Sequence, residues 1–128
     1  MRRSPSQVVP EQNEFTTPVV RLEHADARTG AERWRVTLPA TESSPLVAGG
    51  LVWIGDWAGD VRAFDARTGR LRWTFHADGP VKSSPSLAGG HLFVATYGGH
   101  LYALDPSTGA ELWRASAQTR LFRHGRFY

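Results

Sequence analysis

Residues 65–73, DARTGRLRW, contain the pattern that decides the fold. The same arrangement, Asp-x-x-Thr-Gly with a Trp four residues after the Gly, also occurs at 26–34 and 105–113. A period of about 40 residues is the mark of a repeat protein in which each copy forms one structural unit. The positions that define the three copies are Asp26, Gly30, Trp34, Asp65, Thr68, Gly69, Trp73, Asp105, Thr108, Gly109 and Trp113.

Further matches flank this pattern in the last two copies. Ser43-Ser44-Pro45 returns at 83–85, and Ala48-Gly49-Gly50 returns at 88–90, so 43–76 aligns with 83–116 without a gap. Gly-Gly and Asp-x-x-Thr-Gly are turn-forming sequences, because Gly accepts a positive φ and Asp bonds the turn backbone. Between the turns, the first full unit is predicted to form four short strands, at about 44–48, 51–55, 60–64 and 70–76.

The fourth predicted strand shows the alternation of a half-buried strand. Leu71, Trp73 and Phe75 are expected on its buried face, and the intervening polar residues on its exposed face. Four antiparallel strands in about 40 residues form one blade of a β-propeller. The predicted fold class is therefore all-β, a partial β-propeller with two four-stranded antiparallel blades plus one or two leading strands of a third.

The run from Ala63 to Trp73 and its copy from Ala103 to Trp113 resemble the tryptophan-containing repeat of quinoprotein-type propellers, the PQQ-like repeat family. The resemblance covers roughly 22–116. It implies that the repeat tryptophans pack between adjacent blades, so that Trp34, Trp73 and Trp113 are blade-docking residues. His24 stands where the other copies have Ala, which suggests a terminal or degraded blade.

Domain boundaries follow from where the repeat begins and stops. The tail before the first copy has little periodicity, and the basic aromatic segment after the last copy departs from the repeat. The predicted division is a disordered N-terminal tail at 1–17, PQQ-like repeats at 18–116 (a partial blade at 18–42 and blades at 43–82 and 83–116), and a C-terminal tail at 117–128.

The resemblance leaves two classes of function open, because the family holds both enzymes and non-enzymes. Its dehydrogenases bind pyrroloquinoline quinone and calcium and typically carry a vicinal cysteine pair, whereas this chain has no Cys. The chain is therefore predicted to be non-catalytic, a binding or scaffold module or a fragment of a longer propeller. No catalytic, cofactor-binding or metal-binding residue is assigned. The alternative is a fragment of a quinone-dependent dehydrogenase, which would use both cofactors in a complete ring.

Two groups of residues have both a structural and a functional interpretation. Asp56 and Asp60 flank a hairpin tip and suggest a calcium loop, but the second unit has Thr96 and His100 there, which favours two solvated turn carboxylates. Four aromatic residues at equivalent positions of both units are expected to serve as strand core or hairpin caps rather than as a binding surface. They are Trp53, Trp57, Phe93 and Tyr97.

The net charge of +3 is the difference between 15 basic and 12 acidic residues, and only one of the basic residues is a Lys (Lys82). Arg residues scattered along strands indicate a solvated sheet face rather than nucleic-acid binding.

No signal peptide or membrane-length apolar run is present, so the chain as written is expected in the cytoplasm, although family members are often extracytoplasmic. Family rings usually hold seven or eight blades. Further blades, a protein partner or a homo-oligomer is therefore expected to complete the ring.

Overall fold

The computed structural model describes residues 6–10, 19–41 and 43–116. All regular structure in this part of the chain is β-strand, and each pairing between strands is antiparallel. The strands are β1 (Ser6–Pro10), β2 (Val19–Ala25), β3 (Glu32–Pro39), β4 (Leu46–Ala48), β5 (Leu51–Gly55), β6 (Asp60–Asp65), β7 (Leu71–His76), β8 (Ser86–Ala88), β9 (His91–Ala95), β10 (His100–Leu104) and β11 (Glu111–Ser116).

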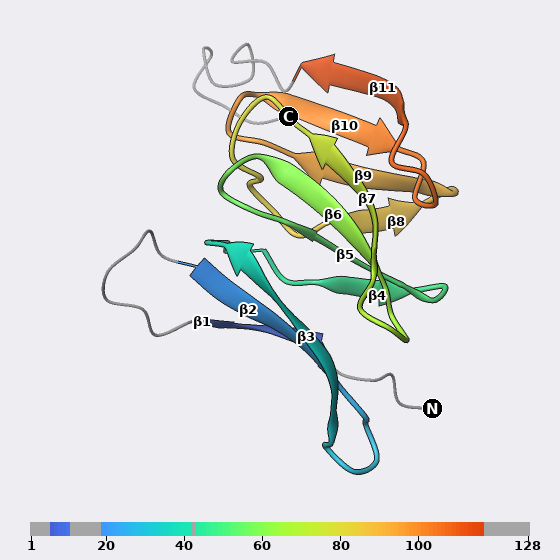
Figure 1. The fold of residues 1–128 in the computed structure, drawn as a ribbon. Coiled ribbons are helices and arrows are strands. Elements are labelled where there is room, and N and C mark those ends of the chain that lie inside the picture. The colour runs from blue at the N-terminus through green and yellow to red at the C-terminus, as the bar shows by residue number, and fades with distance from the viewer. Residues whose placement is uncertain (1–5, 11–18, 42, 117–128) are drawn as a thin grey trace.

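The strands form three sheets that follow one another along the chain. The first sheet has the order β1-β2-β3, the second β4-β5-β6-β7, and the third β8-β9-β10-β11. The sheets are stacked in sequence order, with the first at one end and the third at the other (Figure 1). This arrangement confirms the predicted all-β, partial propeller fold.

Two apolar cores join the three sheets. One core brings Leu22, Trp34 and Leu38 of the first sheet against residues of the second, which are Val52, Ile54 and Phe64. The other brings the opposite face of the second sheet against the third, through Trp53, Val61, Ala63, Trp73, Leu92, Val94, Tyr102 and Leu104. The second sheet is therefore covered on both faces, which explains why β5 is buried along nearly its whole length.

A β-bulge corrects the predicted facing of Leu71. Ala63 pairs with Trp73, but Phe64 pairs with Leu71, so the register shifts by one residue between these pairs. Leu71 consequently shares the side of Phe64 rather than that of Trp73, and it is 51% exposed. The same shift occurs at the start of β3 and of β11, so the bulge belongs to the repeat. Simple alternation cannot reveal it, because a bulge adds one unpaired residue.

Strand β1 corrects the prediction that residues 1–17 are disordered throughout. Ser6–Pro10 pairs with β2 in a register that sets Ser6 opposite His24 and Val8 opposite Leu22. The first sheet therefore has three strands rather than one or two. The segment is too short for periodicity to identify, since its regular structure depends on pairing with residues that lie 10–18 positions further along the chain. The rest of the predicted N-terminal tail, and the whole of 117–128, lies outside the described residues.

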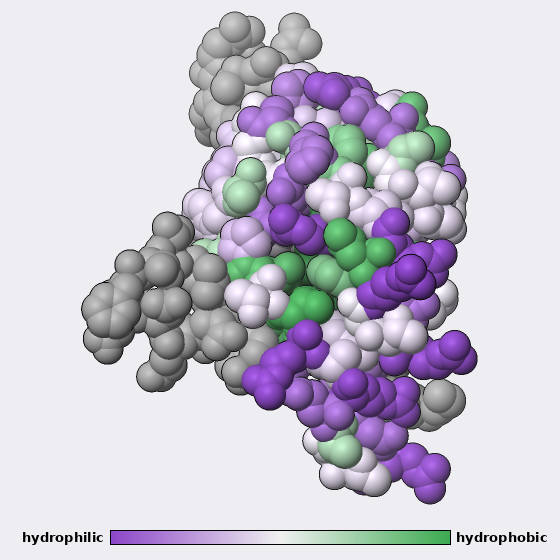
Figure 2. Space-filling model, viewed as in Figure 1, coloured by the Kyte–Doolittle hydropathy of each residue, from purple (hydrophilic) through white to green (hydrophobic). Residues whose placement is uncertain are grey.

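The face of the molecule shown in Figure 2 carries both apolar and hydrophilic residues. Figure 2 shows apolar residues gathered near the middle of this face and hydrophilic residues along the projecting β2–β3 hairpin. The predicted solvent-facing residues Arg33, Arg35, Arg70 and Arg72 are exposed. No helix in the described part of the chain is long and apolar enough to cross a bilayer.

Candidate functional site

The three Asp-x-x-Thr-Gly loops have nearly the same geometry. In each, the Asp Oδ1 atom accepts hydrogen bonds from the backbone N–H groups two and three residues later, at 2.8–3.2 Å. In each, the Gly N–H donates to the Asp carbonyl oxygen at 2.8 Å. The glycines have φ values of 75–78°, a region that residues with a Cβ rarely adopt. The loops are thus built by local hydrogen bonds that every copy encodes.

These hydrogen bonds also act on the loop carboxylates. Backbone N–H groups, chiefly that of Arg67, hold the pKa of Asp65 below its usual value. At Asp26 the main cause of a lowered pKa is a hydrogen bond from the Arg33 side chain, at 2.9 Å. Both carboxylates are therefore stabilised in the ionised form that accepts the loop hydrogen bonds.

Two of the repeat tryptophans pack on the loop of the following repeat. Trp34 donates from Nε1 to the Ala66 carbonyl at 2.8 Å, and a Cβ atom at Gly69 would lie 2.6 Å from its Cδ2. Trp73 donates to the Pro106 carbonyl at 3.0 Å, and a Cβ at Gly109 would lie 2.6 Å from its Cδ2. Each Gly is therefore required twice, for its φ and for the close approach of an indole ring. We call these two contacts the tryptophan joints.

The third tryptophan and the first loop lie at the two ends of the stack. Trp113 is 43% exposed, whereas Trp34 and Trp73 are each 8% exposed. Its Nε1 atom makes no hydrogen bond among the described residues. At the opposite end, apart from Gly30 and its two chain neighbours, none of the described residues has a heavy atom within 4 Å of the place where a Cβ of Gly30 would stand. The chain thus presents one half of a tryptophan joint at each end.

The four matched aromatic residues divide between core and surface. Trp53 is buried, and its Nε1 donates to the same Pro106 carbonyl as Trp73, at 3.0 Å. Phe93 is partly buried and packs against Trp113, with ring centroids 5.8 Å apart. Trp57 and Tyr97 are exposed and stack on each other across the two repeats, with centroids 5.6 Å apart. Sequence comparison of single units does not show this contact, because it joins different units.

Asp56 corrects the prediction of two solvated turn carboxylates. Its side chain is almost fully buried and forms an ion pair with Arg62, which also contacts Asp60 at 3.1 Å. Asp56 Oδ1 in addition accepts a hydrogen bond from the Asp60 N–H at 3.1 Å. The pair therefore ties the tip of the β5–β6 hairpin to its own strand, and the Asp56 carboxylate has its partners within the protein.

Asp78, which no sequence pattern singled out, contacts the β9–β10 hairpin through its carboxylate. Asp78, before β8, accepts a hydrogen bond from Thr96 Oγ1 at 2.6 Å and contacts the His100 ring. Its backbone N–H donates to the Tyr102 hydroxyl at 3.2 Å. The Thr96 hydrogen bond is the main cause that lowers the pKa of Asp78 to about 2. Thr96 stands where the second unit has Asp56, so the carboxylate has changed position between units.

The described residues do not fit a calcium site. Calcium requires six to eight oxygen ligands, usually with several carboxylates. No group of three or more His, Cys, Asp or Glu side chains comes together in the described ranges in an arrangement that could hold a metal ion. Asp56 and Asp60, the two carboxylates at the tip of the β5–β6 hairpin, are already paired with Arg62.

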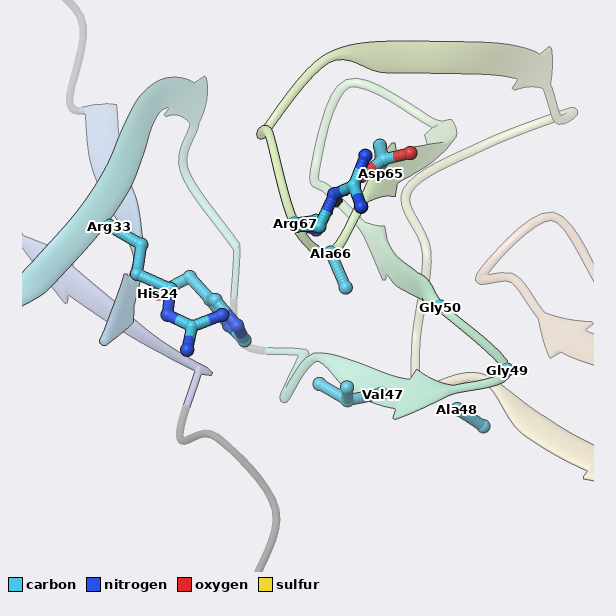
Figure 3. Close-up of a pocket in the computed structure, with 9 residues that line it drawn as sticks. All are labelled: His24, Arg33, Val47, Ala48, Gly49, Gly50, Asp65, Ala66 and Arg67. Carbon is cyan, nitrogen blue, oxygen red and sulfur yellow. Dashed lines mark hydrogen bonds between the residues drawn. The ribbon is translucent and has the colours of Figure 1, made fainter. Parts of the chain in front are cut away.

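Each tryptophan joint borders a cleft between neighbouring sheets. The cleft between the first and second sheets has a volume of about 480 Å³, and Figure 3 shows His24 and Arg33 on one side and Asp65 and Arg67 across from them. The remaining lining residues of this cleft are Val47, Ala48, Gly49, Gly50 and Ala66. The cleft between the second and third sheets, about 400 Å³, is lined mainly by apolar and small residues, with Trp53 and Leu87 among them.

Comparison with known proteins places the chain among propeller proteins. The sequence profile of the family described as outer membrane protein assembly factor BamB matches residues 19–124. The solved structure of BamB from Moraxella catarrhalis is similar, with a TM-score of 0.67 and 28% identity, over 77% of this chain and 34% of that one.

Enzymes are also among the similar proteins. A lupanine 17-hydroxylase [cytochrome c] of a Pseudomonas species is 42% identical over 52 residues, which are 39% of this chain and 8% of that protein. A quinohemoprotein alcohol dehydrogenase from Pseudomonas putida shares the fold, with a TM-score of 0.66 and 22% identity over 88% of this chain and 19% of that one. The chain spans about a third or less of the length of each of these relatives.

Proposed function

Because the chain belongs to the PQQ-like β-propeller family described as outer membrane protein assembly factor BamB, we propose that it is a non-catalytic binding module, part of a propeller ring that further blades complete. The observation that carries this proposal is the half-joint at each end of the stack. Trp113 is exposed at one end, and the loop around Gly30 is open at the other.

The partner of the Trp113 face is an Asp-x-x-Thr-Gly loop. The two tryptophans inside the stack both dock on such a loop, with the indole N–H on a loop carbonyl and the ring on the loop Gly. The Asp26–Gly30 loop of this chain already has the same hydrogen bonds and a φ of 75° at its Gly. In the isolated chain, a second copy supplies this loop, and the contact is head-to-tail.

Light scattering over a range of concentrations tests this proposal on the full chain. The unmodified chain is expected to associate as its concentration rises, and Trp113→Ala to weaken that association by about tenfold or more, as is typical of a buried interface Trp. Trp57→Ala is a matched control, because Trp57 is 40% exposed but lies away from both half-joints. An unmodified chain that stays monomeric throughout, or equal effects of the two variants, would contradict the proposal.

The second candidate is a piece of a quinone-dependent dehydrogenase. It is supported by the 42% identity to part of lupanine 17-hydroxylase. Dye-coupled oxidation of an alcohol, measured after pyrroloquinoline quinone and calcium are added to the full chain, tests this candidate. Turnover above that of the cofactors alone would favour the enzyme, and its absence would remove catalysis by this chain while leaving the binding proposal in place.

A further inference from the structure

The cleft between the first and second sheets has the size and lining of a small-molecule site. Its volume of about 480 Å³ falls within the range of about 300–1,000 Å³ that ligand pockets occupy. The β4–β5 turn and Ala66 supply small and apolar walls, and the polar side chains come from both sheets (Figure 3). A few polar groups converging on an apolar cleft is the usual composition of such sites.

His24 gives this cleft a buried polar group with one ring nitrogen that has no partner among the described residues. The side chain is 2% exposed and stacks on Trp34, with ring centroids 5.2 Å apart. Its Nδ1 atom lies 2.7 Å from Ser6 Oγ, whereas its Nε2 atom has no hydrogen bond among the described residues. A buried polar atom left unpaired costs free energy, and such atoms usually have a protein, water or ligand partner. The Ser6 hydroxyl can donate to Nδ1, in which case Nε2 carries the ring proton and can donate to a ligand in the cleft that His24 lines.

The charge around His24 favours an anion. Arg67 extends from the opposite wall and makes no ion pair among the residues that the structure describes. Arg33 is held at 2.9 Å by Asp26, and the Asp65 carboxylate is engaged by the loop N–H groups and, at 3.6 Å, by Arg72. The lining carboxylate of Asp65 is therefore compensated, while the Arg67 guanidinium has no counterion within the described part of the chain.

The second cleft shows that the repeat itself does not require these groups. Ser107 stands there at the position of Arg67, and Ala63 stands at the position of His24. The ring of Trp53 contributes to that cleft instead, and its indole N–H is satisfied by a carbonyl at 3.0 Å. In the second sheet the large Trp53 pairs with the small Ala63, and in the first sheet the small Ser6 pairs with the large His24. The large ring therefore comes from the third strand counted from the Trp-bearing end in one sheet and from the neighbouring strand in the other. Of these two clefts, only the one between the first and second sheets is therefore lined by basic side chains.

We propose that this cleft binds a small molecule with an anionic group. The anion lies between the Arg67 guanidinium and His24 Nε2, and the apolar part of the ligand lies against Val47, Ala48 and Ala66. Carboxylates and phosphates both meet this description, since both accept charge-assisted hydrogen bonds from Arg. This assignment is independent of whether the ends of the stack bind further blades.

Titration of the full chain with benzoate, phenyl phosphate and benzyl alcohol, followed by two-dimensional NMR, tests the site. Benzoate and phenyl phosphate represent the two anion chemistries, and benzyl alcohol is the uncharged control. Saturable shifts at His24, Gly49, Gly50 and Ala66 are expected with at least one anion and much weaker ones with the alcohol. The stronger anion identifies the ligand class.

Two arginine variants separate a specific site from general charge attraction. Arg67→Ser, which copies Ser107, is expected to weaken anion binding about tenfold, as loss of one charge-assisted hydrogen bond does. Arg28→Ser is the matched control, because Arg28 holds the same position in the exposed first loop. His24→Ala, which copies Ala63, provides a second probe where folding is retained. Equal weakening by both arginine variants, equal binding of the alcohol, or the lack of saturable shifts would overturn the proposal.

Discussion

At Gly69, one residue meets two requirements that have different physical origins. Its φ of 78° disfavours any residue with a Cβ, and the Trp34 ring occupies the place where that Cβ would stand. Gly30 has the first requirement without the second, since no described residue beyond its two chain neighbours comes within 4 Å of the position of its missing Cβ. Comparing Gly30 with Gly69 therefore separates the cost of the backbone conformation from the cost of disturbing the tryptophan joint.

We predict that Gly69→Ala lowers the free energy of unfolding more than Gly30→Ala. Both variants incur about 1 kcal/mol for the left-handed backbone conformation. Gly69→Ala incurs a further cost of about 1–3 kcal/mol, because the methyl group displaces an indole ring from a packed joint. Urea unfolding of the two variants gives the difference. Equal losses would show that the loop Gly is kept for its φ alone.

At the scale of elements, each hairpin between the second and third strands of a full blade is anchored by a carboxylate near its tip. Asp56 comes from the second unit's own hairpin, whereas Asp78 reaches the third unit's hairpin from the linker before β8. In both units a backbone N–H of the hairpin also donates to a linker carbonyl, at 2.8 Å from Trp57 to Ala40 and 2.9 Å from Tyr97 to Pro80. The backbone hydrogen bond between linker and hairpin is therefore the same in both units, whereas the anchoring carboxylate is Asp56 in one and Asp78 in the other.

We predict that Asp78 makes stability depend on pH between about 4 and 2. Its pKa in the folded chain is about 2, below the ordinary value of 3.8, so its contribution is fully present above pH 4 and is lost as pH falls toward 2. Asp78→Asn should lower the unfolding free energy by on the order of 1 kcal/mol at neutral pH, because solvent around this partly exposed carboxylate screens part of the interaction. The gap to the unmodified chain should close by about pH 2, as urea unfolding across this range would show. A gap that does not change with pH would exclude the carboxylate charge as its cause.

At the scale of the whole molecule, the two apolar cores make each sheet depend on its neighbours. The first sheet is joined to the rest through the core that contains Trp34, and the third sheet through the core that contains Trp73. Stability in such a stack is approximately the sum of unit and neighbour terms. Removing one joint should therefore release one end of the stack rather than the whole.

We predict that Trp34→Ala removes hydrogen-exchange protection from β2 and β3 while β9 and β10 retain theirs. Truncating a buried Trp costs about 3–5 kcal/mol, which is enough to free the end sheet from a domain of ordinary stability. Trp57→Ala, which truncates an exposed ring, should leave both regions protected. Native-state exchange followed by NMR measures this, and uniform loss of protection across all three sheets would contradict independent joints.

The sequence alone determined the repeat, its strands and its turns. Asp-x-x-Thr-Gly and Gly-Gly specify their turns through hydrogen bonds and φ values that span a few residues, so these features can be seen in the printed chain. The bulge beside Trp73 and strand β1 escaped prediction, since one breaks the alternation and the other depends on a distant strand.

Which residues of different elements come into contact depends on how the three sheets pack. The tertiary structure set each inner Trp on the loop of the next repeat, buried Asp56 against Arg62, and placed His24 in a cleft opposite Arg67. Such contacts join residues of different elements, and their strength depends on burial, which turns a polar side chain from a solvated group into one that requires a partner. For that reason the propeller repeat can be recognised in the sequence, while the candidate binding site forms only where the first and second sheets pack together.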